Sequence, residues 1–94
     1  MNVKMYKLAW ESDLVSEQKY ILLALVYLAE EDGYTVYGPI SRIAIQTNMS
    51  ERNIQRKLEM LEQLGWVEVA EEASHHLPRV YKIKNPTETV NGGL

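Results

Sequence analysis

The chain has 94 residues, of which 46% are apolar and 24% are charged, and its formal net charge is −3. This length suits one domain, and the composition is ordinary for a folded globular protein. Because the chain contains no cysteine, a disulfide framework and a thiolate metal site are both excluded. The longest apolar run, residues 20–29, is about half as long as a bilayer requires. Residues 1–13 lack the apolar core of a signal peptide, so we expect a cytoplasmic protein without a membrane partner.

The first two segments differ in the strength of their pattern. Residues 1–15 have no clear period, and we expect an N-terminal arm packed on the core or a short strand. Ser16 is a good helix cap and Glu17 suits the positive end of a helix, which predicts a helix over about residues 16–31. Gly33 is the expected stop. Apolar residues at three- and four-residue spacing mark the buried face of this helix: Ile21, Leu22, Leu25, Leu28 and Ala29.

Two further helices follow, separated by a turn. Pro39 is well suited to the first turn of a helix, which predicts a helix over about residues 39–47. Asn48 tolerates left-handed backbone geometry, and Ser50 then caps a helix over about residues 50–64, with Gly65 as its stop. The expected buried faces consist of Ile40, Ile43, Ala44 and Thr47 in the first of these helices, and of Ile54, Leu58, Leu61 and Leu64 in the second.

Beyond Gly65 the apolar period changes to two, which predicts strands over about residues 66–71 and 79–84 around the loop "EASHHLP". Residues 85–94 have no apolar period and are expected to form a flexible tail or linker. Three helices followed by a two- or three-stranded hairpin give a mainly α domain with a small β-hairpin (α+β). This order predicts a winged helix-turn-helix over residues 16–84.

Several segments carry a resemblance to a known family. The stretches "SEQK", "LLALVYLA", "VYGPI", "LEMLEQLGWVEV" and "RVYKI" occur in the order found in one type of domain. Together they resemble the winged helix-turn-helix domain of phage and plasmid replication proteins. The resemblance implies double-stranded DNA as partner, a recognition helix over about residues 50–64 in the major groove, and a role in DNA replication.

The side of this third helix opposite its leucines carries Arg52, Gln55, Arg56, Glu59 and Gln63. Arg pairs with guanine, Gln with adenine, and Glu accepts a hydrogen bond from cytosine. Arg52, Gln55 and Arg56 are therefore the best base-reading candidates, followed by Glu59. Ser50, Asn53 and the chain near Gly38 are candidates for phosphate contacts. The competing interpretation is a solvated helix face without a ligand.

Four residues outside this helix have alternative interpretations. Arg42 can reach a phosphate or pair with a neighbouring Glu. His75 and His76, near Arg79 at the hairpin tip, are an exposed pair without a role, or they contact phosphate or the minor groove. A metal site is disfavoured, because adjacent strand residues point to opposite faces and no other His or Cys is present.

No catalytic constellation or phosphate-binding glycine loop is present, so we expect neither an enzyme nor a cofactor. Three functions stay open: a replication initiator domain, a small transcription regulator, and a protein-interaction winged helix. The negative net charge, Glu71, Glu72 and the outward-facing Ile45 favour the third. The partners are DNA with replication or transcription proteins in the first two cases. The chain is expected to be a monomer in isolation or a weak homodimer on DNA.

Overall fold

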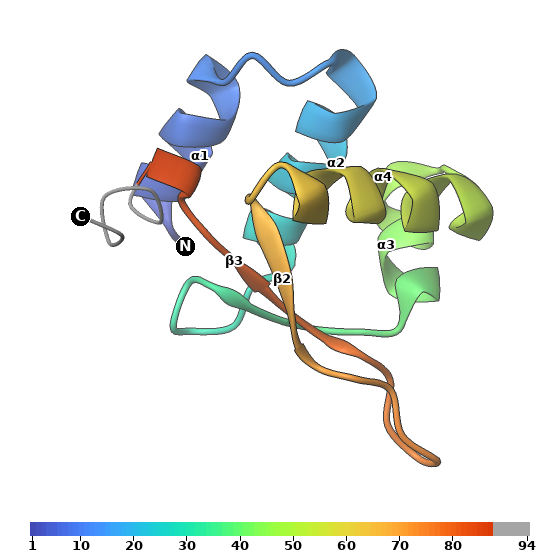
Figure 1. Ribbon diagram of the computed structural model, residues 1–94. Helices are drawn as coiled ribbons and strands as arrows, with labels where there is room; N and C mark the ends of the chain where they lie inside the picture. The colour runs from blue at the N-terminus through green and yellow to red at the C-terminus, as the bar shows by residue number, and fades with distance from the viewer. Residues whose placement is uncertain (88–94) are drawn as a thin grey trace.

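Helices and strands are interleaved along the chain in the computed structural model, which describes residues 1–87 (Figure 1). Their order is α1 (Val3–Glu11), α2 (Ser16–Leu28), β1 (Thr35–Tyr37), α3 (Ile40–Thr47), α4 (Glu51–Gln63), β2 (Val67–Glu71) and β3 (Val80–Ile83). The helices lie on one side of the three-stranded antiparallel sheet. This confirms the predicted α+β class, with one helix more than expected and with three strands, the larger of the two numbers predicted.

The N-terminal segment is a helix, which corrects the arm or short strand expected for residues 1–15. Asn2 caps α1, because its side-chain oxygen accepts the Met5 N–H at 3.0 Å while its amide donates to the Gly33 carbonyl at 3.1 Å. Met5 and Ala9, one turn apart, are buried in the core. The cap and these two side chains hold α1 against the rest of the domain.

The sheet has the strand order β1-β3-β2. The predicted hairpin is confirmed as β2 and β3, with Val67 opposite Ile83 and a register irregularity between Val69 and Glu71. The third strand comes from residues 35–37, and Val36 pairs with Tyr81 of the central strand. The segment that leads into α3 is therefore tied to the hairpin.

The start of α4 follows local signals, whereas both ends of α2 depart from those expected. Ser16 does not cap α2, because Val15 is the N-cap residue and Ser16 is the first helical residue. Ser50 caps α4, since its hydroxyl oxygen accepts the Asn53 N–H at 3.1 Å, and Asn48 has the left-handed conformation expected, with φ 59°. Helix α2 ends at Leu28, before the expected Glu31, because Ala29 is extended and the Glu30 N–H donates to Thr35 at 2.8 Å. Pairing with the start of β1 thus ends α2, and Gly33 lies in the turn that follows.

The core lies between the helices and the sheet. Leu64 was expected in it but is 53% exposed, because α4 ends at Gln63 and the chain turns at Leu64 and Gly65. Of the predicted tail, residues 85–87 follow β3, with Pro86 near Gly65, while residues 88–94 lie outside the described residues. Across residues 1–87, no helix combines the length and the apolar character needed to cross a membrane. The buried side chains come from every helix and strand and include Ile21, Leu22, Leu25, Val36, Ile43, Ile54, Leu58, Leu61, Val67, Tyr81 and Ile83.

Candidate nucleic-acid interface

Helix α4 is held in a fixed rotation by its apolar side. Ile54, Leu58 and Leu61 are all at most 3% exposed, and α4 packs against α2, α3 and β2. The Ser50 cap fixes where the helix begins, because a side-chain oxygen satisfies one of its free N–H groups. Because these three apolar side chains are buried on one side of α4, the opposite side of the helix must face solvent.

The opposite side of α4 is free, as the sequence predicted. Its five side chains are exposed, and among the described residues none has a hydrogen-bond or ion-pair partner. Such a row of unpaired donors and acceptors is available to a ligand without breaking any internal contact. The five residues are Arg52, Gln55, Arg56, Glu59 and Gln63.

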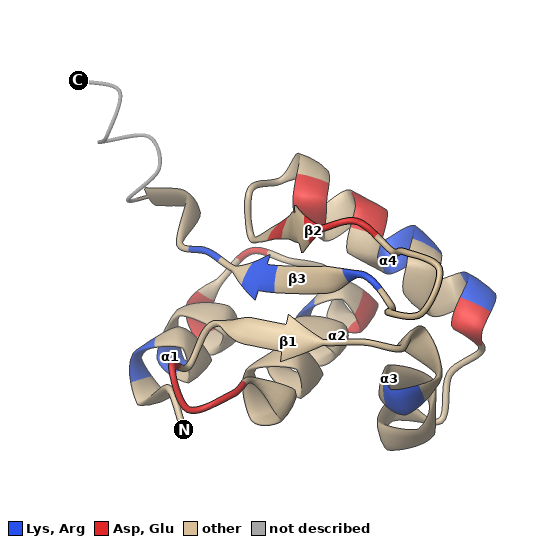
Figure 2. Ribbon diagram, turned by 90° about the horizontal axis from the view of Figure 1, so that it is seen from below, with Lys and Arg blue, Asp and Glu red and all other residues tan. Residues whose placement is uncertain are grey.

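Charge is divided along this helix. Figure 2 shows Lys and Arg in the N-terminal half of α4 and on α3, and Asp and Glu both at the start of α4, where Glu51 lies, and toward its C-terminal end. Lys57 does not add to the positive outer face, because its largely buried side chain pairs with Glu17 at 3.5 Å. The cationic part of the surface is therefore made by Arg52 and Arg56, with Arg42 exposed on α3.

A groove of about 490 Å³ separates α4 from the β2–β3 hairpin. It brings together Gln55 and Glu59 of α4 and Arg79 of the hairpin, which the sequence placed far apart, and it adds Glu62. Arg52, Arg56 and the two histidines do not line it. The groove is thus more acidic than the N-terminal half of α4, and Glu59 belongs to this acidic region.

Arg79 is engaged within the hairpin. Its guanidinium forms an ion pair with Glu72, with Nη2 at 2.9 Å and Nε at 3.0 Å from the same carboxylate oxygen. Its pKa is raised by a hydrogen bond with Tyr81 and by the negative charge of Glu72. Arg79 remains charged, but a phosphate would have to compete with Glu72 for it.

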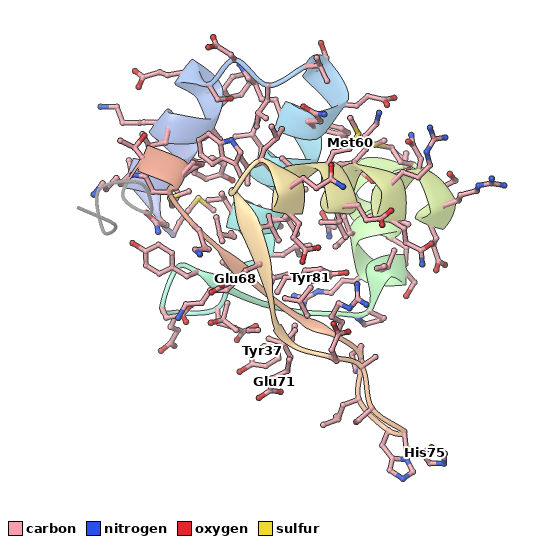
Figure 3. The ribbon with its side chains drawn as sticks, in the orientation of Figure 1. Tyr37, Met60, Glu68, Glu71, His75 and Tyr81 are labelled. Atoms are coloured by element: carbon pink, nitrogen blue, oxygen red, sulfur yellow. The ribbon has the colours of Figure 1, made fainter. Side chains whose placement is uncertain are left out.

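The two histidines lie at the tip of the hairpin. Figure 3 shows His75 at its far end, away from all the helices. Both residues are exposed, and their rings meet edge to face with centroids 5.1 Å apart. Within the described part of the chain, no group of three potential metal ligands is present. The exposed tip can therefore contact another molecule, such as a phosphate group, whereas no third metal ligand lies near the two histidines among the described residues.

The remaining candidates for phosphate contacts differ in how exposed they are and in whether an internal hydrogen bond engages them. Arg42 is exposed and donates to the Tyr37 carbonyl at 3.5 Å, and among the described residues it has no Glu partner. The Gly38 N–H donates to the Arg79 carbonyl at 3.3 Å and is not free, but α3 begins after Pro39 without a side-chain cap, so amides of its first turn stay open to a ligand. Asn53 is half-buried beside the Ser50 cap. Arg42 is therefore the strongest of these candidates.

One exposed surface was missed in the sequence. Tyr20 and Tyr27 on α2, together with Trp10 on α1, are each about half exposed or more. The i, i+7 spacing of the two tyrosines was a signal for a second apolar face. It was missed because residues 20–28 of α2 are all apolar, so that only the buried face was assigned and the two tyrosines were given no role.

Comparison of the chain with family models, with curated proteins and with solved structures found no match. The functional inference therefore depends on the arrangement of the described residues.

Proposed function

We propose that the chain is a winged helix-turn-helix domain that binds double-stranded DNA sequence-specifically, with α4 as its recognition helix in the major groove. The observation that carries this proposal is the free, exposed side of α4 opposite buried Ile54, Leu58 and Leu61. A helix of this kind fits the major groove of B-DNA, where base edges present distinct donors and acceptors. The turn through Asn48 between α3 and α4 supports the same interpretation.

Arg52, Gln55 and Arg56 are the residues that we assign to base reading. They lie in the N-terminal half of α4, the part that usually contacts bases in helix-turn-helix proteins. Each carries the planar donor or donor–acceptor group that pairs with guanine or adenine. Glu59 is less suited, since it faces the acidic groove that also contains Glu62, where phosphates are repelled.

Phosphate contacts are assigned to Arg42 and to the tip of the hairpin, which is the wing in this proposal. Arg42 is exposed on α3, which packs against α4. His75 lies beyond the body of the domain and the His76 ring contacts it, so this tip is suited to a phosphate backbone or a minor groove. Arg79 contributes only when it leaves Glu72.

The biological context rests on the resemblance of the sequence to phage and plasmid replication proteins. We propose the DNA-recognition domain of a replication initiator, with a small transcription regulator as the alternative of the same class. Both use the same surface, so the target sequence distinguishes them.

A different class, a protein-interaction winged helix, is favoured by one observation. The groove between α4 and the hairpin is lined by Glu59 and Glu62, which have no partner among the described residues, on a chain of net charge −3. A domain that used this groove for a protein would not need the cationic half of α4. The experiment that follows separates the two classes.

The test is selection of random duplexes with the purified chain, followed by binding measurements on the enriched sequence. Contact with Z phosphates gives a slope near −0.9Z for log affinity against log salt. We expect Arg52→Ala to weaken binding and Gln55→Ala to relax base preference at one position, each by about 1–3 kcal/mol. Lys7→Ala is the control for Arg52→Ala, because it removes a positive charge from an exposed position on α1, away from α4.

Gln63→Ala is the matched control for Gln55→Ala, because both glutamines are exposed on the same helix but at opposite ends. The control should bind as the unchanged protein does. Failure to enrich any duplex, or equal effects of the two glutamine substitutions, would contradict DNA reading by the N-terminal half of α4.

A further inference from the structure

Helix α2 carries a second apolar face that residues 1–87 leave partly uncovered. On one side Ile21, Leu22 and Leu25 are fully buried. On the other, Tyr20 is 47% and Tyr27 is 57% exposed. Aromatic side chains grouped on a surface mark protein interaction sites more often than scattered apolar residues do.

This face combines projections with a hollow. A depression of about 420 Å³ lies over α2, which sits between α1 and α3 in Figures 1 and 2. At its edge Trp10, one of the lining residues, is 63% exposed, and the Tyr20 hydroxyl donates a hydrogen bond of 3.3 Å to the Thr47 carbonyl. None of the residues that line the depression carries a formal charge. The depression is lined mainly by Tyr6, Trp10, Tyr20, Leu23, Ala24 and Tyr27.

The stripe along α2 is symmetric in its residue order. Tyr20, Leu23, Ala24 and Tyr27 occupy positions i, i+3, i+4 and i+7, which share one side of a helix. From either end of the helix, the stripe presents an aromatic ring, then two smaller apolar side chains, then a second aromatic ring. A second α2 lying antiparallel would place each Tyr20 opposite a Tyr27, with the two smaller pairs at the twofold axis. An isologous interface requires this self-complementarity.

From these features we infer that the face formed by α1 and the outer side of α2 binds a second copy of this chain. Trp10, Tyr20 and Tyr27 leave 63, 47 and 57% of their surfaces uncovered. Aromatic side chains bury about 150–250 Å² each, so the three offer roughly 250–400 Å² per copy. A stable interface covers about 800 Å² per partner, so the dimer is weak and forms at high protein concentration. The uncharged lining lets two copies of an acidic chain approach.

The dimer surface and the outer side of α4 are made by different residues. Dimerisation therefore does not depend on the proposed DNA binding, although a twofold dimer would present two α4 helices to paired half-sites. Measuring the dimer without DNA makes failure of one proposal distinguishable from failure of the other.

The experiment is sedimentation equilibrium of the full chain from about 10 µM to about 1 mM, which spans weak complexes. The weight-average mass should rise from the monomer value of 10.9 kDa toward twice that value. Tyr27→Lys should keep the mass near the monomer value at every concentration. Tyr37→Lys is the matched control, because Tyr37 is 51% exposed on β1, outside this face, and it should dimerise as the unchanged chain does.

The antiparallel register has its own test. The double variant Tyr20→Lys/Tyr27→Glu places opposite charges across the interface and should still dimerise, whereas Tyr20→Lys/Tyr27→Lys places like charges together and should not. Circular dichroism checks folding, and Trp10→Lys replaces Tyr27→Lys if that variant unfolds. A chain that stays monomeric up to the highest concentration, or equal behaviour of Tyr27→Lys and Tyr37→Lys, would overturn the inference. Loss of dimer in both double variants would overturn the antiparallel pairing.

Discussion

The orientation of α4 can be tested by one substitution made at two positions. Leu61 is fully buried, while Leu64, one turn further along, is 53% exposed. Replacing leucine by alanine removes three carbon groups, so the lost transfer free energy is about 2.4 kcal/mol at a fully buried position. The cavity left at Leu61 adds to this loss, which gives a total of about 3–5 kcal/mol.

At Leu64 about half of the side chain is already in water, so Leu64→Ala should cost only about 1 kcal/mol. For a domain of 94 residues, unfolding entropy is about 0.2 kcal/mol per degree, so Leu61→Ala should lower Tm by roughly 15 °C or more and Leu64→Ala by about 5 °C. Thermal and urea unfolding followed by circular dichroism measures both. A small loss at Leu61 would mean that α4 is rotated from the position described, and the exposed reading face would then be lost with it. A large loss at Leu64 would mean that the chain beyond Gln63 packs on the core.

Three further predictions concern local contacts. Ser50→Ala should lower the free energy of unfolding measured in urea by about 1 kcal/mol, because the Asn53 N–H loses its acceptor. A change near zero would mean that the Ser50 cap does not stabilise α4. Asn48→Ala should cost about 1–2 kcal/mol and Asn48→Gly almost nothing, since only glycine matches asparagine in the left-handed region, so an equal cost for both would contradict that reason. Hydrogen bonds from the Thr35 hydroxyl and from the Thr35 and Tyr34 amides lower the pKa of Asp32 from 3.8 to about 2. This contribution to stability is complete above pH 3.8 and is lost as pH falls toward 2, so Asp32→Asn should show a smaller decrease in Tm over that interval than the unchanged chain.

The element boundaries that the sequence determined are those set by local chemistry. Ser50 and Asn48 define the start of α4 through a side-chain hydrogen bond and a backbone conformation that involve only their neighbours. The three-to-four-residue spacing of Ile54, Leu58 and Leu61 defined which side of α4 is exposed, because helix geometry converts spacing directly into direction. The free side chains Arg52, Gln55 and Arg56 followed from the same geometry.

Tertiary structure alone decided the features that depend on distant partners. Residues 1–15 carry no clear period, and α1 is held by Met5, Ala9 and a hydrogen bond from Asn2 to Gly33, 31 positions away. The end of α2 and the third strand were set by pairing of residues 35–37 with β3, since a short strand needs a neighbour to satisfy its backbone groups. The pairing of Arg79 with Glu72 and the uncovered aromatic face of α2 depend in the same way on which surfaces the fold brings together. The spacing of residues along the chain determines which side of a helix a side chain faces, but only the packing of distant segments determines which residues it contacts.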